Sequence, residues 1–305
     1  MIYSQGREVF SSGARDRQKI SETRHKPWKR ASMDQEFTYI GKDGCKLFAR
    51  MIEPEGKAEV ASLVLLHGGG PDHQSLWPLA THVGDSVKVI VPDIRGYGRS
   101  ICMEPDLHRW SQYARDVVSL LEHLAIERAI IGGAGLGGTI ALRTAIEHPD
   151  RVAALVVMSM EDVEDDAAKA LEIRFMEDFA HRVRKDGLQA AWAPILPDLA
   201  PDIGAMVKEA IPRSCPESIA AAAAIGRDRA FGSVTDLAQI DVPALIFPGI
   251  DWRHPAHVAA EAAAIMPQGR MASLGISEQL QDSQDYAEAL GPPLMTFINS
   301  LRATR

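Results

Sequence analysis

The chain has 305 residues, of which 46% are hydrophobic, so it can build one large domain or two small ones around a sizeable core. The formal net charge is −8, and no basic field is present to attract nucleic acid or an anionic membrane surface. Three widely spaced cysteines and the lack of a long apolar run predict reduced thiols, no membrane span and a cytoplasmic location.

Residues 1–33 differ in composition from the rest, being rich in Arg, Lys and Ser and poor in aliphatic side chains. The segment lacks the apolar stretch of a secretory signal. Its arginines fit an organelle transit peptide, but Glu8, Asp16 and Glu22 weigh against one, and we predict a disordered basic extension. Patterned sequence begins just after Met33, which is therefore an alternative start of the protein.

Short strand-like runs alternate with helical patterns over residues 34–160 and 236–305, the two parts of the predicted core. The pattern opens with an antiparallel hairpin over 37–40 and 46–52. The strands of buried type that follow cover 62–66, 87–91, 129–131, 154–157 and 243–247, with a weaker strand at 270–274. The helical patterns cover 75–83, 110–125, 138–148, 256–265 and 283–301. This alternation predicts an α/β protein whose mostly parallel sheet carries helices on both faces.

The segment between the two parts of the core and the closing helix both contain prolines. Residues 161–235 contain no strand-like run, and prolines divide them into several helical patterns, so we predict an all-helical insertion. The acidic run at 161–166 is interpreted as the solvated start of a helix rather than a metal site. Pro292 and Pro293 are expected to interrupt the closing helix.

The most informative motif is a glycine-rich segment between a predicted strand and a predicted helix. Gly133, Gly135 and Gly137 have the spacing of a nucleophile elbow, in which the sequence Gly-x-nucleophile-x-Gly lifts a side chain above the end of a parallel sheet. Gly135 holds the nucleophile position and has no side chain to lift. The segment therefore predicts an enzyme fold without its usual nucleophile.

Four motifs in chain order define a family resemblance. They are the His-Gly-Gly-Gly run at 67–70, the loop at 92–100, the glycine elbow with the following His-Pro-Asp-Arg-Val at 148–152, and Pro-Gly-Ile-Asp at 248–251. Over residues 34–303 the chain resembles the α/β-hydrolase fold superfamily, in particular the capped branch of esterases, lactonases, epoxide hydrolases and carbon–carbon bond hydrolases. The resemblance implies a mostly parallel eight-stranded sheet and a helical cap, residues 161–235, inserted after strand 6.

The same resemblance implies an oxyanion hole made of backbone amides. The amides of Gly69 and Leu136 would form it, and Gly68 and Gly70 would let the loop approach a substrate closely. Backbone donors survive a side-chain substitution, so the hole can persist without a serine. The alternative interpretation is that these glycines only make tight turns. Asp93 is expected to hold the next loop in place.

The Ser–His–Asp triad of the family is incomplete in this sequence. Gly135 replaces the nucleophile, and no histidine occurs in the loop at 274–280, where the family places it. The acid corresponds to Asp251, which is alternatively an N-cap or turn residue before the next helix.

Histidines elsewhere in the sequence are candidates for a substitute base. His73, just past the glycine run, is a candidate proton carrier, and His254 and His257 lie near Asp251. For each of these histidines the favoured interpretation is a packing or surface role. No third ligand completes a metal site, and no cofactor is implied.

Three functions remain open. The first is an enzyme that acts on a small carbonyl or ester-type substrate without a serine nucleophile, through lyase, cyclase or atypical hydrolase chemistry at a retained oxyanion hole. The second is a non-catalytic protein that binds a small ligand, and the third is a scaffold with a filled pocket. Small molecules are thus the expected partners, with no nucleic acid and no membrane, and the oligomeric state is not predicted. We expect no labelling by a fluorophosphonate probe, and no efficient esterase from Gly135→Ser alone, since no base is evident.

Overall fold

The computed structural model describes residues 33–54, 61–160, 166–251 and 253–303. The predicted N-terminal extension lies outside the described residues, except for Met33, which begins the first strand. The predicted acidic helix start at 161–166 also lies outside them, apart from Asp166, the first residue of a helix.

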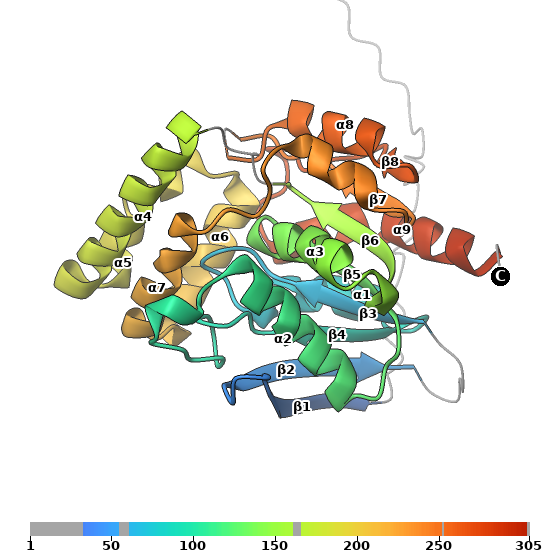
Figure 1. Ribbon diagram of the computed structural model, residues 1–305, viewed down its shortest axis with the longest axis horizontal. Coiled ribbons are helices and arrows are strands. Elements are labelled where there is room, and N and C mark those ends of the chain that lie inside the picture. The colour runs from blue at the N-terminus through green and yellow to red at the C-terminus, as the bar shows by residue number, and fades with distance from the viewer. Residues whose placement is uncertain (1–32, 55–60, 161–165, 252, 304–305) are drawn as a thin grey trace, which may run out of the picture. The chain divides into compact units, whose positions relative to one another are not determined.

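Eight strands form one sheet in the order β1-β2-β4-β3-β5-β6-β7-β8 (Figure 1). The strands are β1 Met33–Ile40, β2 Lys46–Glu53, β3 Ser62–Leu66, β4 Lys88–Pro92, β5 Ala129–Ala134, β6 Val152–Met158, β7 Ala244–Phe247 and β8 Gly269–Met271. β2 pairs antiparallel with both β1 and β4, and every other pairing is parallel. The predicted hairpin, strand sequence and mostly parallel sheet are therefore confirmed.

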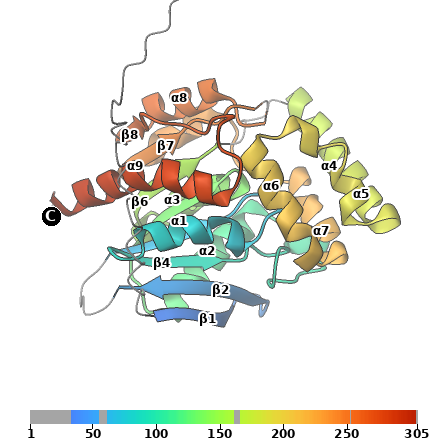
Figure 2. The ribbon, with the colours of Figure 1, turned by 180° about the vertical axis from the view of Figure 1, so that it is seen from behind.

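Helices cover both faces of the sheet, as predicted (Figures 1 and 2). One face carries α1 Trp77–Val83 and α9 Ser283–Ala303, and the other carries α2 Trp110–His123, α3 Leu136–Glu147 and α8 Ala256–Ile265. Short 3-10 helices η1 His73–Leu76, η2 Pro105–Leu107 and η3 Pro149–Arg151 join these elements.

Alternate residues of each parallel strand enter two separate hydrophobic cores. In β3, Leu63 and Leu65 pack with α1 and α9, whereas Val64 and Leu66 pack with α2, α3 and α8. This alternation follows from the two-residue repeat of a strand. Because both faces are covered, all four side chains are buried, which explains why the strand reads as a continuous apolar run.

The closing helix corrects one expectation. α9 continues through Pro292 and Pro293 instead of stopping at them. Its buried face, which includes Leu290, Leu294 and Ile298, packs in the core beside α1 on both sides of the prolines. This packing offsets the hydrogen bonds that the two prolines cannot donate.

Between β6 and β7 the described residues form helices joined by short turns, and no strand. Residues 166–239 are here called the helical insertion. Its elements are α4 Asp166–Asp186, α5 Leu188–Trp192, η4 Leu196–Asp198, α6 Pro201–Ala210, η5 Ile211–Arg213, α7 Pro216–Ala222, η6 Ala223–Arg227 and η7 Val234–Gln239. The boundary placed at residue 235 from the sequence falls inside η7. The helices α4 to α7 lie together beside one end of the sheet (Figures 1 and 2).

Specific polar contacts fasten this insertion to the core. Arg213 donates two hydrogen bonds to the Asp72 carboxylate, at 2.6 and 2.9 Å. Although burial alone would raise the pKa of Asp72, these bonds lower it below its ordinary value. The Ser218 hydroxyl donates to the Gly96 carbonyl at 2.9 Å, so a second helix of the insertion is also tied to a core loop.

Candidate functional site

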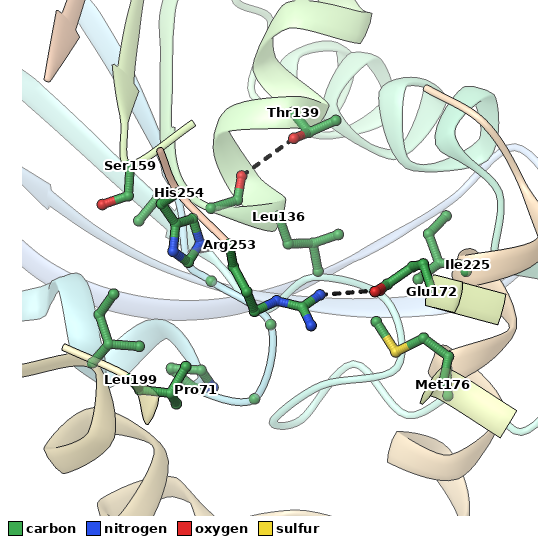
Figure 3. Close-up of a pocket in the computed structure, with 18 of the residues that line it drawn as sticks. Pro71, Leu136, Thr139, Ser159, Glu172, Met176, Leu199, Ile225, Arg253 and His254 are labelled. Atoms are coloured by element: carbon green, nitrogen blue, oxygen red, sulfur yellow. Dashed lines mark hydrogen bonds and ion pairs between the residues drawn. The ribbon is translucent and has the colours of Figure 1, made fainter. Parts of the chain in front are cut away.

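A cavity of about 560 Å³ lies where the loops after β3, β5, β6 and β7 meet the helical insertion (Figure 3). This volume is in the range of pockets that hold small organic molecules. The insertion contributes mainly apolar side chains to the wall: Phe175, Met176, Phe179, Trp192, Ile195 and Met206. The core loops contribute several glycines and the side chain of His254. The cavity therefore suits a small, moderately apolar molecule.

The glycine segment after β5 has the backbone of a nucleophile elbow. Gly135 has φ 49° and ψ −115° and precedes α3 as its N-cap residue. The flanking glycines are required by space: a Cβ on Gly137 would lie 2.2 Å from the Leu66 carbonyl oxygen, and one on Gly133 would lie 2.3 Å from the Gly137 carbonyl carbon. Gly135 itself lines the cavity. The turn is thus kept although its central residue has no side chain.

The residues predicted for an oxyanion hole come together at the same place. Gly68, Gly69, Gly70 and Leu136 all line the cavity. A Cβ built on Gly69 would lie 4.0 Å from that of Leu136, so the loop after β3 runs beside the start of α3. On Gly70, which has φ 105°, a Cβ would lie 2.7 Å from the Trp192 ring of the insertion. The glycines therefore allow a close approach of three chain segments around the cavity.

His67 holds this loop in position. Its Nε2 accepts a hydrogen bond from the Ile94 backbone at 2.9 Å, which leaves Nδ1 to donate to the Gly68 carbonyl at 2.8 Å. Burial lowers the pKa of His67, which is fully enclosed. A neutral imidazole with a fixed tautomer thus supports the loop and does not face the cavity.

His73 occupies a different place from the one expected of a proton carrier. Its Nδ1 lies 2.8 Å from Asp93 Oδ1, its ring packs 4.8 Å from that of Phe48, and it is 3% exposed. It is not among the residues that line the described cavity. Asp93 also accepts hydrogen bonds from the backbone amides of His73 and Arg99, so it holds the loop, as expected. The geometry corrects the candidate role of His73: this side chain fastens one loop to another.

The histidine that lines the cavity is His254, three residues after Asp251. Its Nδ1 lies 2.8 Å from Asp251 Oδ1, which also accepts hydrogen bonds from the backbone amides of Arg253 and His254 at 3.0 Å each. Asp251 is therefore both a turn residue and the partner of an imidazole. With Nδ1 donating to the carboxylate, Nε2 is the ring nitrogen that can accept a proton.

Electrostatics favour an ionised Asp251. Burial alone would raise the pKa of this carboxyl, but the hydrogen bond and electrostatic interaction with His254, together with hydrogen bonds from the backbone amides, lower it below its ordinary value. An ionised carboxylate orients the imidazole and stabilises its protonated form. The Asp251–His254 pair can thus act as a general base that faces the cavity.

Arg253 points to the insertion rather than to the Asp251–His254 pair (Figure 3). Its Nη2 donates to Glu172 of α4 at 3.0 Å, and its guanidinium carbon lies 5.1 Å from the centre of the Phe175 ring. This contact joins the loop after β7 to the helical insertion along the cavity wall.

Ser159 and Tyr286 also line the cavity and were not nominated by the sequence. Ser159 directly follows β6, and Tyr286 lies in the first turn of α9. Neither belongs to a motif, and no local pattern distinguishes them from ordinary core residues.

Within the described ranges, no three His, Cys, Asp or Glu side chains come together in a way that could hold a metal ion. None of the helices in these ranges has both the length and the apolar character needed to cross a membrane.

A mostly parallel sheet, a glycine elbow after its central strand and a carboxylate–imidazole pair after β7 define a hydrolase-type scaffold. The family model for the alpha/beta hydrolase fold matches residues 61–268. The chain belongs to this family.

Individual relatives match over part of their length. A 2-hydroxy-6-oxononadienedioate/2-hydroxy-6-oxononatrienedioate hydrolase of Comamonas testosteroni is 31% identical over 131 residues, which are 42% of this chain and 45% of the relative. A 2-hydroxymuconate semialdehyde hydrolase of Pseudomonas sp. (strain CF600) is 38% identical over 109 residues, 33% of this chain and 37% of the relative. The chain thus matches less than half of each relative's length.

Solved structures match over nearly the whole fold. A thermophilic esterase from Thermogutta terrifontis superposes with a TM-score of 0.73 at 22% identity, covering 88% of this chain and 99% of the esterase. An enol-lactonase from Burkholderia xenovorans LB400 gives 0.72 at 19% identity, covering 86% and 100%. At these identities the likeness shows the fold alone.

Proposed function

We propose that the protein acts on a small, moderately apolar carbonyl or ester-type compound without forming a covalent serine intermediate. The observation that carries this proposal is the combination of Gly135 at the elbow with His254, held by Asp251, in one cavity. The names of the relatives support a carbonyl substrate, since they are hydrolases of oxo-dienoates and of a semialdehyde.

In this proposal the base acts on water or on the substrate itself. His254 Nε2 removes a proton from a water molecule as the water oxygen attacks the carbonyl carbon, or it removes a proton from the substrate in a lyase or cyclase reaction. Asp251 stabilises the imidazolium that forms. The imidazolium then returns the proton to the leaving group, so His254 is regenerated without an acyl-enzyme.

The glycine loop would supply the electrostatic part of the catalysis. Negative charge that develops on the carbonyl oxygen is met by the backbone amides of Gly69 and Leu136, whose segments run side by side at the cavity. One such donor contributes about 3 kcal/mol to lowering a barrier. The helical insertion would act as a cap that excludes water from the apolar part of the cavity.

Hydrolysis of p-nitrophenyl butyrate, followed together with intact-protein mass, tests this function. We expect turnover above the uncatalysed rate, no accumulated acyl-enzyme and no labelling by a fluorophosphonate probe. His254→Gln should lower kcat/KM by roughly 10²–10⁴-fold. The matched control is His257→Gln, because His257 is exposed on α8 and should be dispensable.

Two outcomes would contradict the proposal. Stoichiometric labelling by the probe, or a burst of nitrophenol with an acylated protein, would show a serine or cysteine nucleophile. Tight binding of carbonyl compounds with no turnover would instead favour the alternative function, a non-catalytic protein that binds a small ligand.

A further inference from the structure

Several buried polar atoms near the Asp251–His254 pair have no hydrogen-bond partner among the described residues. In the described part of the chain, buried side-chain atoms without a hydrogen-bond partner include Ser159 Oγ, both carboxylate oxygens of Asp202 and the Tyr286 hydroxyl. Buried polar groups are normally paired, and each unpaired one lowers stability. Several such atoms in one place therefore indicate a site that a ligand completes.

These three residues come from separate elements that meet at the cavity. Ser159 follows Met158, which pairs with Ala134 in the sheet, so it lies next to the elbow; it is 2% exposed. Tyr286 comes from α9, and Asp202 from α6, which packs against α9. Ser159 and Tyr286 line the cavity together with His254 (Figure 3 labels Ser159 and His254).

Asp202 is not among the residues that line the cavity, but it places a carboxyl group near Tyr286, Asp251 and His254. It is 0% exposed, and burial, reinforced by the nearby Asp251, raises its pKa to about 6. Burial and the Asp202 carboxylate also raise the pKa of Tyr286 well above its ordinary value. Tyr286 is therefore a neutral hydroxyl that donates a hydrogen bond and does not release its proton.

The signs of these charges decide what the site accepts. Two carboxylates, Asp202 and Asp251, stand beside one imidazole. Three cations also line the cavity: Lys169 on α4, Arg229 after η6, which pairs with Asp166, and Arg253, whose guanidinium is directed to Glu172 on α4. A carboxylate ligand would add a third negative charge at this place. A neutral oxygen that both accepts and donates hydrogen bonds matches the two hydroxyls.

We propose that Ser159 and Tyr286 form a polar subsite that hydrogen-bonds a neutral oxygen function of the ligand, an alcohol, enol or carbonyl, next to His254. The inference rests on the proposed function in one respect, which is that the ligand occupies this cavity. The subsite selects against ligands whose group at this position is an anion.

Equilibrium binding of two probes of similar shape tests the subsite: 4-phenylbutan-1-ol and 4-phenylbutyrate, titrated at pH 8 by calorimetry into the full-length protein. We expect the alcohol to bind at least about tenfold more tightly than the carboxylate. Ser159→Ala and Tyr286→Phe should each weaken binding of the alcohol by roughly three- to tenfold, the usual worth of one hydrogen bond.

The controls are hydroxyls that already have partners outside the cavity. Ser119 donates to the Arg115 carbonyl at 2.9 Å, and the Tyr113 hydroxyl lies 2.8 Å from His108 Nδ1. Ser119→Ala and Tyr113→Phe should leave the affinity for the alcohol unchanged and lower the Tm. Ser159→Ala and Tyr286→Phe should leave the Tm of the free protein unchanged or raised, because no hydrogen bond is lost.

The inference is overturned if the alcohol binds equally to the wild type and to the Ser159→Ala, Tyr286→Phe double variant, or if 4-phenylbutyrate binds more tightly than the alcohol. Should Tyr286→Phe fail to fold, Ser159→Ala alone decides. Since the titration involves no turnover, its result is independent of the ester assay. Binding that depends on both hydroxyls in a protein without hydrolytic activity would refute the proposed reaction and leave the subsite in place.

Discussion

Gly135 and Ser159 directly follow Ala134 and Met158, which lie opposite each other at the ends of the parallel strands β5 and β6, and both have positive φ angles, 49° and 53°. Glycine adopts this conformation without strain, whereas serine does not. Among the described residues, Ser159 and Ala125 are the non-glycine residues with positive φ. Strain is thus absent at the elbow and present beside it, at a residue that lines the same cavity.

This strain predicts that Ser159→Gly stabilises the free protein by about 1 kcal/mol. Ser159→Ala should change the free energy of unfolding by less than about 0.5 kcal/mol, because alanine keeps the strain and the lost hydroxyl has no described partner. Urea unfolding of both variants measures these differences. A destabilised Ser159→Gly would show that the hydroxyl makes a stabilising hydrogen bond.

Asp202 predicts a pH-dependent stability difference. The folded protein holds the proton of this carboxyl up to about pH 6, whereas the unfolded chain releases it near the ordinary pKa of 3.8. Between these values the folded state binds more protons, so the contribution of Asp202 to stability falls as the pH rises. We expect Asp202→Asn to be more stable than the wild type by about 3 kcal/mol at pH 7.5 and about equally stable near pH 4.

Urea unfolding at the two pH values checks this, since every other titrating group is common to both proteins. An equal effect at pH 4 and pH 7.5 would mean that the charge of Asp202 is not the cause.

The contact between Asp72 and Arg213 predicts how firmly the insertion is held. Removing one partner leaves a buried carboxylate without its cation, so Arg213→Gln should destabilise the protein by about 1–2 kcal/mol and increase hydrogen exchange in α6. Arg227→Gln is the control, since its ion pair with Glu177 is largely exposed and should contribute little. Equal effects of the two substitutions would contradict the structural role of the buried pair.

The glycine elbow and the glycine run after β3 should differ in how well they tolerate an added methyl group. Gly137→Ala places Cβ against the backbone carbonyl of Leu66, which cannot move away, and should cost about 3 kcal/mol or more. Gly68→Ala meets its nearest neighbour, the Ala134 carbonyl oxygen, at an ordinary 3.7 Å and should be tolerated within about 1 kcal/mol. Thermal unfolding of the two variants compares them directly. Similar losses would mean that the elbow and the β3 loop are not packed as described.

Much of the core could be predicted from the sequence, because parallel strands buried on both faces give short apolar runs. α8 was predicted with the bounds it has, 256–265, and the hairpin of β1 and β2 was also predicted. α9 was predicted over 283–301 and spans Ser283–Ala303, but the predicted interruption was wrong, because packing of the buried face keeps the helix continuous through Pro292 and Pro293.

The histidine of the candidate site was harder to predict. In the sequence, His254 and His257 are equivalent candidates near Asp251; in the structure α8 begins at Ala256, and His254 lies in a turn closed by Asp251. The usable signal was an Asp-x-x-His spacing directly after a strand. The expectation for Gly135→Ser assumed that no base was present; with His254 in the same cavity, that reason no longer applies.

The polar subsite could not be read from the sequence because its members are brought together only by folding. Ser159 follows β6 and Tyr286 belongs to α9, while the neighbouring Asp202 lies in the first turn of α6. No periodicity or spacing connects them. Their shared property, unpaired polar atoms inside the protein, exists only in three dimensions.

Because Asp202 is carried by α6, the segment between β6 and β7 is more than a cover for the cavity. Recombining this protein with a homologue by exchanging residues 166–239 would replace one of the two carboxylates that set the electric field at the imidazole. Such a chimaera would take its elbow and the Asp251–His254 pair from one parent and the wall of the cavity from the other, so the shape of the cavity and a buried charge beside the imidazole would be exchanged as one module.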